Sequence, residues 1–528
     1  MFIEKLKNRF LFSVLIVLFT FLGNKAVVEA KILINEDNFP DENFRNYIID
    51  SVYGCYYDTK EDTWCLNEGD IQYVKYIICQ GSSDENGGIV SLKGIELFPE
   101  LEGLNCDYNQ LTELDLSKNL KLTSLHCSNN QLKELDISNN ALLKTVFCTN
   151  NQLTDIKTGE LNNLDWFFCE KNQLTNLDLC KAVHLKKLSC GNNKLTQIDL
   201  SKNTELEMLA CTNNQIKELM LSENRALLDL SCGYNQLTSL DVSKNIMLKT
   251  LWCGENPLRS LDISNNEQLT GLVCVGCQLS ELDVSHNLNL GTFQCSKNML
   301  TSINVSMLAD LISFDCGANQ LKEIDVGSNL KLRQLNCNDN QLTQIDISKN
   351  VKLEGFDCMN NQLTDLDLSN NPLLEAIGCS CNQLSLLDIT KNKELQQLLC
   401  EGNQLKTLDV SQNPILKDEV ANGKRTAFQS PYKIIGYWYS KTGPFGHGVL
   451  VDKDVVVLTE AILKGDCDGN SEINRADRMY LSRAIAGWEG YELPAANAAD
   501  FNGDGVVNRA DRMYLARALA GWEGYSLN

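Results

Sequence analysis

The chain has 528 residues, and 69 acidic against 47 basic side chains give it a formal net charge of −22 at pH 7. This balance argues against nucleic acid and anionic lipid as partners, because both bind through a basic surface. The length is sufficient for several domains.

Residues 1–30 have the pattern of a secretory signal peptide. Three basic residues precede an apolar run over residues 10–22, and VEA at residues 28–30 provides a cleavage site. The run is shorter than the about 20 residues that a membrane span needs, although an anchor helix is the alternative. No second apolar run follows, so the sequence predicts a secreted, extracellular protein without membrane insertion.

Cysteine recurs every 21 residues through the middle of the chain, fifteen times without an insertion. One unit, residues 101–121, reads LEGLNCDYNQLTELDLSKNLK. A fixed period of this size predicts a solenoid, because one coil cannot bury its own leucines and must stack on its neighbours. The fifteen residues, called the ladder cysteines below, are Cys106, Cys127, Cys148, Cys169, Cys190, Cys211, Cys232, Cys253, Cys274, Cys295, Cys316, Cys337, Cys358, Cys379 and Cys400.

Each ladder cysteine occupies an inward, leucine-like position, which favours a small buried apolar side chain over metal or redox chemistry. Cα–Cβ directions in adjacent coils are parallel, which disfavours disulfides, so we expect thiols. Outside the ladder, a disulfide between Cys55 and Cys65 is left open. An asparagine three residues after each ladder cysteine is expected to bond the backbone of its own and the adjacent coil. In the ninth unit Cys277 takes this position, where it can act as a weak donor.

The repeating unit resembles the nested 21-residue class of bacterial leucine-rich repeats, L-x-x-L-x-[LC]-x-x-N-x-L-x-x-L-D-L-S-x-N, over residues 101–415. The resemblance implies a β-rich solenoid of parallel stacked coils, roughly 70 Å long at about 4.8 Å per coil. It also implies an N-terminal cap at residues 31–100, with Pro40 in the first turn of a short helix that reaches about Ile49. Residues 416–463 are expected to form a C-terminal cap or linker, in which YKIIGYWY and DVVVL are typical of strands.

An aspartate recurs at one outward position of the unit. Stacked carboxylates repel one another, which cations would relieve. The alternative, which we favour, is that each carboxylate bonds neighbouring backbone or serine hydroxyls. These aspartates are Asp115, Asp136, Asp178, Asp199, Asp241, Asp262, Asp283, Asp325, Asp346, Asp367, Asp388 and Asp409.

Aromatic side chains occupy outward positions beside the ladder cysteines. Phe147, Trp166 and Phe168 fall on adjacent units and are expected to form one exposed aromatic patch, with Trp252 farther along the same side. Exposed apolar patches often mark interaction sites, so a protein or a stacked sugar ring is a candidate ligand. Packing under a neighbouring loop is the alternative.

Catalytic patterns do not stand out in this sequence. The four histidines do not accompany a nucleophile motif, and no paired-carboxylate signature or phosphate-binding loop is evident. We therefore expect a protein that is not an enzyme. Residues 31–100 and 417–460 are left open as carriers of an unrecognised hydrolase.

Two nearly identical stretches end the chain, NRADRMYLSRAIAGWEGY at residues 474–491 and NRADRMYLARALAGWEGY at residues 508–525. Each overlaps a twelve-residue acidic loop, DCDGNSEINRAD at 466–477 and DFNGDGVVNRAD at 500–511. Oxygen ligands at positions 1, 3, 5, 9 and 12, with a carbonyl at position 7, are spaced to wrap around Ca²⁺. Both loops have Asp at position 12, and neither has an incoming helix.

Residues 464–528 resemble a type I-like dockerin, the module that attaches cellulosomal proteins to a cohesin of a scaffoldin. The resemblance implies two Ca²⁺ ions and calcium-dependent folding of this small module. The implied ligands are Asp466, Asp468, Asn470, Glu472, Asn474 and Asp477 in one loop, and Asp500, Asn502, Asp504, Val506, Asn508 and Asp511 in the other. The implied cohesin contacts are Arg475, Ala476, Arg478 and Arg483, matched by Arg509, Ala510, Arg512 and Arg517.

The duplicated charged positions predict two equivalent cohesin-binding faces related by a pseudo-twofold axis. Together these patterns indicate a secreted, non-catalytic protein of a polysaccharide-degrading complex of the cellulosome type. Its solenoid would bind a protein or a glycan or act as a spacer, and the scaffoldin would hold it at the cell surface. A leucine-rich surface adhesin is the alternative, as is a carrier of a hydrolase activity.

Overall fold

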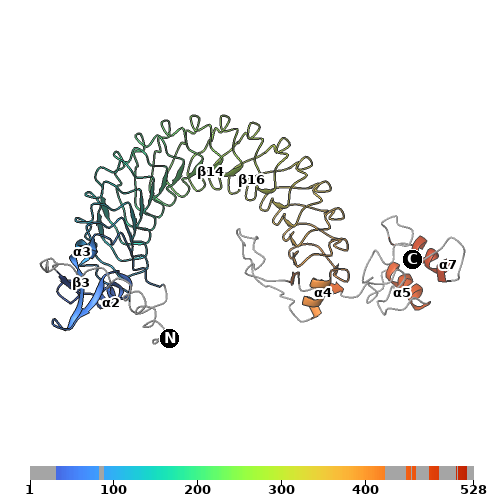
Figure 1. Cartoon of the computed structure of the whole chain (residues 1–528). Coiled ribbons are helices and arrows are strands. Elements are labelled where there is room, and N and C mark those ends of the chain that lie inside the picture. Colours follow the sequence, from blue (N-terminus) through green and yellow to red (C-terminus); the bar gives the residue numbers. More distant parts are fainter. Residues whose placement is uncertain are drawn as a thin grey trace.

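The computed structural model describes residues 31–82, 88–421, 448–452, 455–458, 475–486, 507 and 509–519. Residues 31–458 of this set form a curved solenoid with a cap at its N-terminal end, and residues 475–519 contain a pair of helices (Figure 1). The predicted fold class, a leucine-rich solenoid with caps followed by a small helical module, is confirmed.

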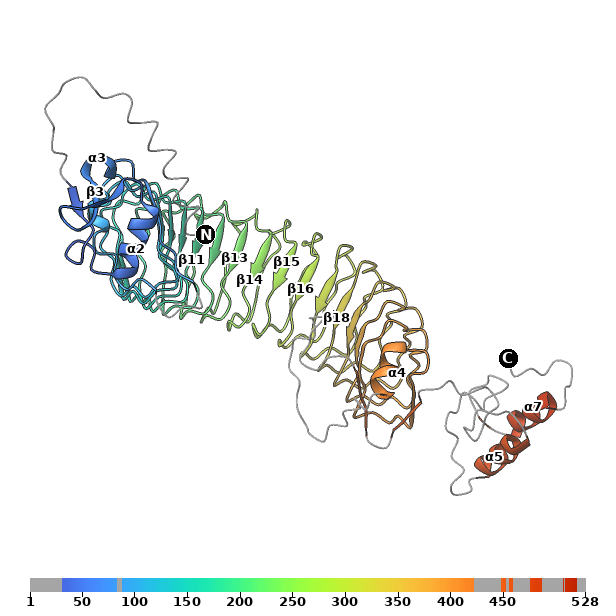
Figure 2. The same cartoon turned by 60° about the horizontal axis from the view of Figure 1, so that its bottom comes forward.

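The solenoid is built on one parallel sheet whose strands are three residues long and come from successive coils. Each strand pairs in register with the next, and among the described strands no pairing joins β4 to β23, so the sheet is open. Figure 1 shows the strands along the inner, concave side of the arc, and Figure 2 shows them side by side. The strands are β4 (Tyr76–Ile78), β5 (Gly103–Asn105), β6 (Ser124–His126), β8 (Thr145–Phe147), β10 (Trp166–Phe168), β11 (Lys187–Ser189), β12 (Met208–Ala210), β13 (Asp229–Ser231), β14 (Thr250–Trp252), β15 (Gly271–Val273), β16 (Thr292–Gln294), β17 (Ser313–Asp315), β18 (Gln334–Asn336), β19 (Gly355–Asp357), β20 (Ala376–Gly378), β21 (Gln397–Leu399) and β23 (Gly448–Leu450).

Which side chains of each coil are buried follows from the alternation of side-chain direction along a strand. The middle residue of each strand points into the solenoid, as Leu125, Val146 and Phe167 do, while the first and third residues face the concave surface. The ladder cysteine follows the third residue and is buried again. One continuous apolar core therefore runs through all coils.

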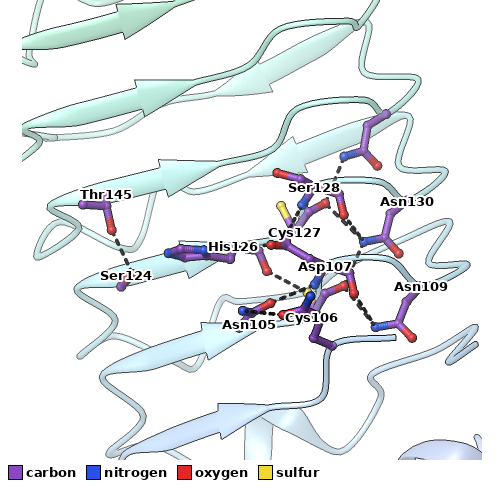
Figure 3. A network of polar contacts seen from close by, with 12 residues as sticks. Asn105, Cys106, Asp107, Asn109, Ser124, His126, Cys127, Ser128, Asn130 and Thr145 are labelled. Carbon is purple, nitrogen blue, oxygen red and sulfur yellow. Dashed lines mark hydrogen bonds and ion pairs between the residues drawn. The ribbon is translucent and has the colours of Figure 1, made fainter. Parts of the chain in front are cut away.

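The ladder asparagine joins each coil to the one before it. Asn130 donates from Nδ2 to the carbonyls of Cys106 and Cys127 at 2.9 and 3.2 Å, and its Oδ1 accepts the Leu111 N–H at 3.0 Å (Figure 3). The residue before it, Asn129, is in the left-handed region with φ 57°, which asparagine tolerates better than most residues. The predicted bonding of both coils by one amide is confirmed.

A second buried asparagine closes the other side of most coils. Asn140 donates to the carbonyls of Leu116 and Asn119 at 3.2 and 2.9 Å, and Asn245 makes the equivalent bonds. These bonds satisfy carbonyl groups that the buried turn would otherwise leave unpaired.

The N-terminal cap covers the first coil with a short antiparallel sheet and helices. Helix α2 begins after its N-cap Asp41, whose Oδ1 accepts the Phe44 N–H at 2.9 Å and whose Oδ2 accepts the Val90 N–H at 2.7 Å. Pro40 therefore lies just before the helix, and its predicted place in the first turn is wrong by about two residues. The cap elements are β1 (Lys31–Leu33), α2 (Glu42–Ser51), β2 (Cys55–Asp58), β3 (Thr63–Asn67), α3 (Glu68–Ile71) and the 3₁₀ helix η1 (Ile95–Leu97).

The register of β2 and β3 decides the open question about the cap cysteines. Cys55 lies opposite Leu66, and Cys65 lies opposite Tyr56. Side chains alternate along a strand, so Cys55 and Cys65 face opposite sides of the sheet and are not bonded to each other.

The C-terminal end adds one further coil to the sheet. Strand β23 pairs with β21, and β24 (Val456–Leu458) pairs with β22 (Thr407–Asp409), with helix α4 (Pro414–Ala421) after the last regular coil. The predicted strand in DVVVL is therefore confirmed. The predicted strand in YKIIGYWY lies outside the described residues. A second short pair, β7 (Glu134–Asp136) with β9 (Asp155–Lys157), lies at the other side of the early coils.

Candidate functional site

Three rings line up on the concave face near its N-terminal end. His126, Phe147 and Phe168 are the third residues of adjacent strands, and their ring centroids are 4.5 and 4.9 Å apart. The spacing follows from strand stacking, because in-register residues of neighbouring parallel strands are about 4.8 Å apart. We call these three residues the aromatic row; all three are half-buried.

Trp166 flanks the aromatic row from the first position of β10, two residues from Phe168 on the same face. Its side chain is 40% exposed, and Lys187 Nζ from the next strand lies 4.7 Å from its ring centroid. The predicted neighbours Phe147, Trp166 and Phe168 thus lie together, and of the three Trp166 is the most exposed. On the other side of Trp166, Ser124 and Thr145 share a hydrogen bond of 2.8 Å (Figure 3).

Trp252 does not join the aromatic row. It is the third residue of β14, with β11, β12 and β13 between it and β10, and its ring contacts Tyr234 at a centroid distance of 6.4 Å. Small side chains, Ser189, Ala210 and Ser231, occupy the equivalent positions between them. Trp252 is therefore a separate exposed ring on the same face.

The C-terminal half of the concave face is polar, which sequence reasoning did not predict. Asp315 and Asp357 hold third strand positions on β17 and β19, with Asn336 between them. Ser296 donates to Asp315 at 2.9 Å, and the Met359 N–H donates to Asp357 at 3.0 Å. Asp357 is almost fully buried.

Burial shifts the pKa of these two carboxyl groups. It raises the pKa of Asp357 to about 7 and raises that of Asp315 above its usual range. The sequence offered one signal for this pair. An acidic residue holds the outward third position of two strands that are separated by one coil. Their burial depends on the side chains of adjacent coils, which the repeat does not specify.

The repeated aspartates cap turns. In all twelve, Oδ1 accepts the backbone N–H two residues later, as in Asp115 with Ser117 at 2.9 Å. This bond lowers the pKa of Asp115 and of most other members of the set. The favoured alternative, bonding to neighbouring backbone, is confirmed. Within the described residues, no group of three or more His, Cys, Asp or Glu side chains is placed to hold a metal ion.

The ladder cysteines are buried in the core, as predicted, and none of them is in a disulfide. The pKa of each is raised, by burial in Cys190 and Cys337 and by the neighbouring Cys277 side chain together with burial in Cys253, so the thiols are protonated at neutral pH. They act as small apolar side chains of the solenoid.

The C-terminal helix pair has the same design in both halves. Helices α5 (Arg475–Ile485) and α7 (Arg509–Leu519) pack together through Leu481 and Leu515, which are fully buried. These leucines occupy the same place in the two copies of the duplicated stretch, and Tyr480 and Tyr514 pack beside them. The sequence repeat is therefore also a structural repeat.

The predicted cohesin-contact residues differ in how exposed their side chains are. Arg478, Arg509, Ala510 and Arg512 are exposed, whereas Arg483 and Arg517 are half-buried in both copies. Met479 and Met513, which sequence reasoning missed, are exposed at matching positions, by 52% and 50%. Arg475 and Ala476 begin α5, but their side chains lie outside the described residues.

One implied calcium ligand can be placed. Asp511 is the third residue of α7 and is wholly buried. A buried carboxylate at the last position of an acidic loop fits a hard cation that takes oxygen ligands. Asp477 lies at the equivalent place in α5, with its side chain outside the described residues. The remaining implied ligands also lie outside them: Asp466, Asp468, Asn470, Glu472, Asn474, Asp500, Asn502, Asp504, Val506 and Asn508.

Comparison with known proteins agrees with both parts of the chain. A family model described as the dockerin type I domain matches residues 464–520. The functional domain of InlJ from Listeria monocytogenes, which includes a cysteine ladder, is 32% identical with a TM-score of 0.61, over 73% of this chain and 79% of that one. The leucine-rich repeat protein LIC12759 of Leptospira interrogans shares the fold at 22% identity with a TM-score of 0.52, over 66% of this chain and 94% of its own.

Two further observations accompany these matches. A search of curated proteins found no match. In the part of the chain that the structure describes, no helix is both long and apolar enough to cross a membrane. The chain belongs to the bacterial leucine-rich repeat proteins with a cysteine ladder, and it carries a dockerin type I domain at residues 464–520.

Proposed function

We propose that this protein is a secreted, non-catalytic component of a cellulosome-type, polysaccharide-degrading complex. Its dockerin binds a cohesin of a scaffoldin, and this attachment holds the leucine-rich solenoid at the cell surface. The match to the dockerin type I domain over residues 464–520 carries the proposal.

The helix pair supports docking through either half of the module. Arg478 and Met479 on α5 are exposed, and so are Arg512 and Met513 at the matching positions of α7. Arginine and methionine are both enriched in protein–protein interfaces relative to the rest of the protein surface. Two such surfaces of equal composition give a cohesin two equivalent ways to bind.

Calcium, as two bound ions, is the proposed cofactor of the module. The loop oxygens would hold the ions, and Asp511 and Asp477 would tie each loop to the helix that follows. The helices share a core of few side chains, so the ion–carboxylate bonds would supply much of the stability of the module.

The solenoid is the proposed ligand-binding module. Trp166 and the aromatic row provide an exposed, rigid aromatic surface on the concave face, and Lys187 adds a positive charge to it. Such a surface suits either an extended protein segment or a sugar ring, which stacks on aromatic faces. The absence of catalysis is supported by the roles of the two repeated reactive side chains, since the ladder thiols are protonated in the core and the repeated aspartates cap turns.

Titration of the full chain with type I cohesins, with calcium and then with a chelator, tests the docking. We expect binding with calcium and its loss with the chelator. Failure to bind any member of a broad cohesin panel would overturn the docking proposal. Capture experiments with residues 31–460, against secreted proteins and against plant polysaccharides, test the solenoid separately.

A further inference from the structure

Trp252 lies in the middle of the concave sheet, where small residues leave room for its ring (Figure 2). It is the third residue of β14, and the third residues of β12 and β13 are Ala210 and Ser231. The position two residues after the third strand residue is Gly233 in the coil of β13 and Gly254 in the coil of β14. The indole ring therefore meets few bulky side chains from the preceding coils.

The ring occupies the space that these two glycines leave open. A Cβ added at Gly233 would lie 3.0 Å from Trp252 Nε1 and 3.3 Å from its Cε2, and one added at Gly254 would lie 3.5 Å from Nε1. Neither glycine has a positive φ, and other coils carry side chains at this position, such as Thr212 and Ser296. The backbone angle does not require glycine here, but the absence of a side chain lets the nitrogen edge of the indole lie close to both coils.

Tyr234 stands at a right angle to the indole ring. The two ring planes make an angle of 86°, and the ring centroids are 6.4 Å apart. An edge-to-face arrangement of this kind is one of the two that aromatic pairs prefer, so the two rings hold each other in place. Trp252 remains 40% exposed and Tyr234 50% exposed. We call these two residues the aromatic corner.

Charged side chains border the aromatic corner in equal numbers of each sign. Glu255 holds the repeat position of Tyr234 in the next coil, and its carboxylate lies 3.8 Å from Lys297 Nζ. Asp229 on β13 accepts the Thr250 hydroxyl at 2.5 Å, and Lys249 precedes that threonine. Two acids and two lysines cancel in charge, yet their oxygen and nitrogen atoms can still form hydrogen bonds. Such a border suits an uncharged ligand that carries many hydroxyl groups.

The size of the aromatic corner suits a single small ring. A stable protein–protein interface buries about 800 Å² on each partner, which is far more than two partly exposed rings provide. A pyranose ring has an apolar face of C–H groups and a rim of hydroxyl groups. It therefore matches an exposed aromatic surface that has polar groups at its edge.

We propose that Trp252 and Tyr234 form a sugar-binding site that holds one uncharged pyranose unit of a glycan. The C–H face of the sugar packs on the exposed surface of Trp252, and the Tyr234 ring closes one side. The phenol hydroxyl of Tyr234 and the carboxylate of Glu255 bond the hydroxyl groups of the sugar. The strands β11, β12 and β13 separate this site from Trp166 on β10, so it depends neither on a ligand of Trp166 nor on the docking of the helix pair.

NMR titration of the full chain in calcium buffer, which follows the signals of added oligosaccharides, tests the site. The probes are short uncharged oligomers of glucose, xylose and mannose, with oligogalacturonate as the acidic comparison. We expect at least one uncharged oligomer to bind. Failure of all three to bind, or binding of oligogalacturonate alone, would overturn the proposal.

Variants locate the bound sugar. Trp252→Ala should weaken binding roughly tenfold or more, because it removes the surface on which the sugar packs. Tyr234→Ala should also weaken binding. Tyr108→Ala is the matched control for Tyr234, because Tyr108 has the same repeat position in another coil and is 42% exposed; it should bind as the native protein does.

Thermal denaturation checks that each variant is folded. The proposal is wrong if folded Trp252→Ala binds the sugar as tightly as the native protein. It is also wrong if Trp166→Ala loses the binding and Trp252→Ala keeps it, since the sugar would then lie on the other exposed indole.

Discussion

The ammonium group of Lys187 lies over the indole ring of Trp166, 4.7 Å from its centroid, across two adjacent strands of the concave sheet. The contact holds the ring in place while 40% of the side chain remains exposed. A cation over an aromatic face contributes on the order of 0.5–1 kcal/mol at an exposed site. Trp166 is therefore preorganised to meet a ligand of the solenoid.

Replacing Trp166 and Phe168 with alanine should weaken the capture of a solenoid ligand at least tenfold. Both rings belong to the exposed side of the sheet, so the loss of stability should stay near 1–2 kcal/mol, mostly from the Phe147–Phe168 contact. Binding assays and thermal denaturation measure the two effects. Trp252→Ala is the matched control, because it removes an equally exposed ring at a separate place on the same face. Equal losses in both variants would contradict a specific role for Trp166.

Removing calcium should unfold the C-terminal helix pair and leave the solenoid folded. The two helices share a small core around Leu481 and Leu515, whereas the solenoid has a continuous core of its own. Circular dichroism of residues 464–528, with calcium and with a chelator, should show helicity only with calcium. Equal helicity in both conditions would contradict metal-dependent folding.

Damage to one face of the helix pair should hardly change cohesin binding. If the faces are equivalent, Arg478→Asp or Arg512→Asp alone removes one of two ways to bind, which costs RT ln 2, about 0.4 kcal/mol. The double variant should lose a charge-assisted contact in either orientation, about 1.5–3 kcal/mol or more. Isothermal titration gives all three affinities. A single variant that abolishes binding would show that the faces are not equivalent.

Asparagine and cysteine at the same repeat position should differ in stability. Asn256→Ala leaves the buried Leu237 N–H without its acceptor, at a cost of about 1–3 kcal/mol. It also removes one donor from the carbonyls of Cys232 and Cys253, which keep the Asn235 amide and the Cys277 thiol as donors. Cys277→Asn should instead raise the unfolding midpoint of the reduced protein, because it restores the amide. Urea denaturation in a reducing buffer compares the two.

The buried carboxyl of Asp357 should make the solenoid less stable as the pH rises from about 4 to 7. Its folded-state pKa, about 7, lies above the ordinary value near 3.8, so the folded protein binds more protons than the unfolded chain in this window. Stability is therefore lost between the two values, on the order of a few kcal/mol. Asp357→Asn should remove this part of the pH dependence and stabilise the protein at pH 8. Urea denaturation midpoints at pH 5 and pH 8, measured for the native protein and for Asp357→Asn, test this prediction. An identical change of midpoint with pH in the two proteins would rule out Asp357 as the cause.

The 21-residue period by itself determined most of the solenoid. A residue at a given repeat position meets the same positions of the coils before and after it, so the repeat specifies its surroundings. The burial of the ladder cysteines, the bonds of Asn130 to two coils and the turn-capping role of Asp115 could all be predicted for this reason. The duplicated tail likewise predicted a helix pair with matched side chains, as Leu481 and Leu515 show.

Only the tertiary structure decided which contacts are made by the side chains that differ from coil to coil. Phe147 and Phe168 meet because they share a register position on adjacent strands, while Trp252 is separated from them by three strands with small side chains. Asp357 is buried by its particular neighbours, and Gly378 on the next strand leaves room beside its carboxylate. Cys277 Sγ lies 3.4 Å from the Cys253 carbonyl because the side chain at the asparagine position turns back toward the preceding coil. These contacts join residues about 21 or more positions apart, and their side chains differ from coil to coil, so only the packed solenoid specifies them.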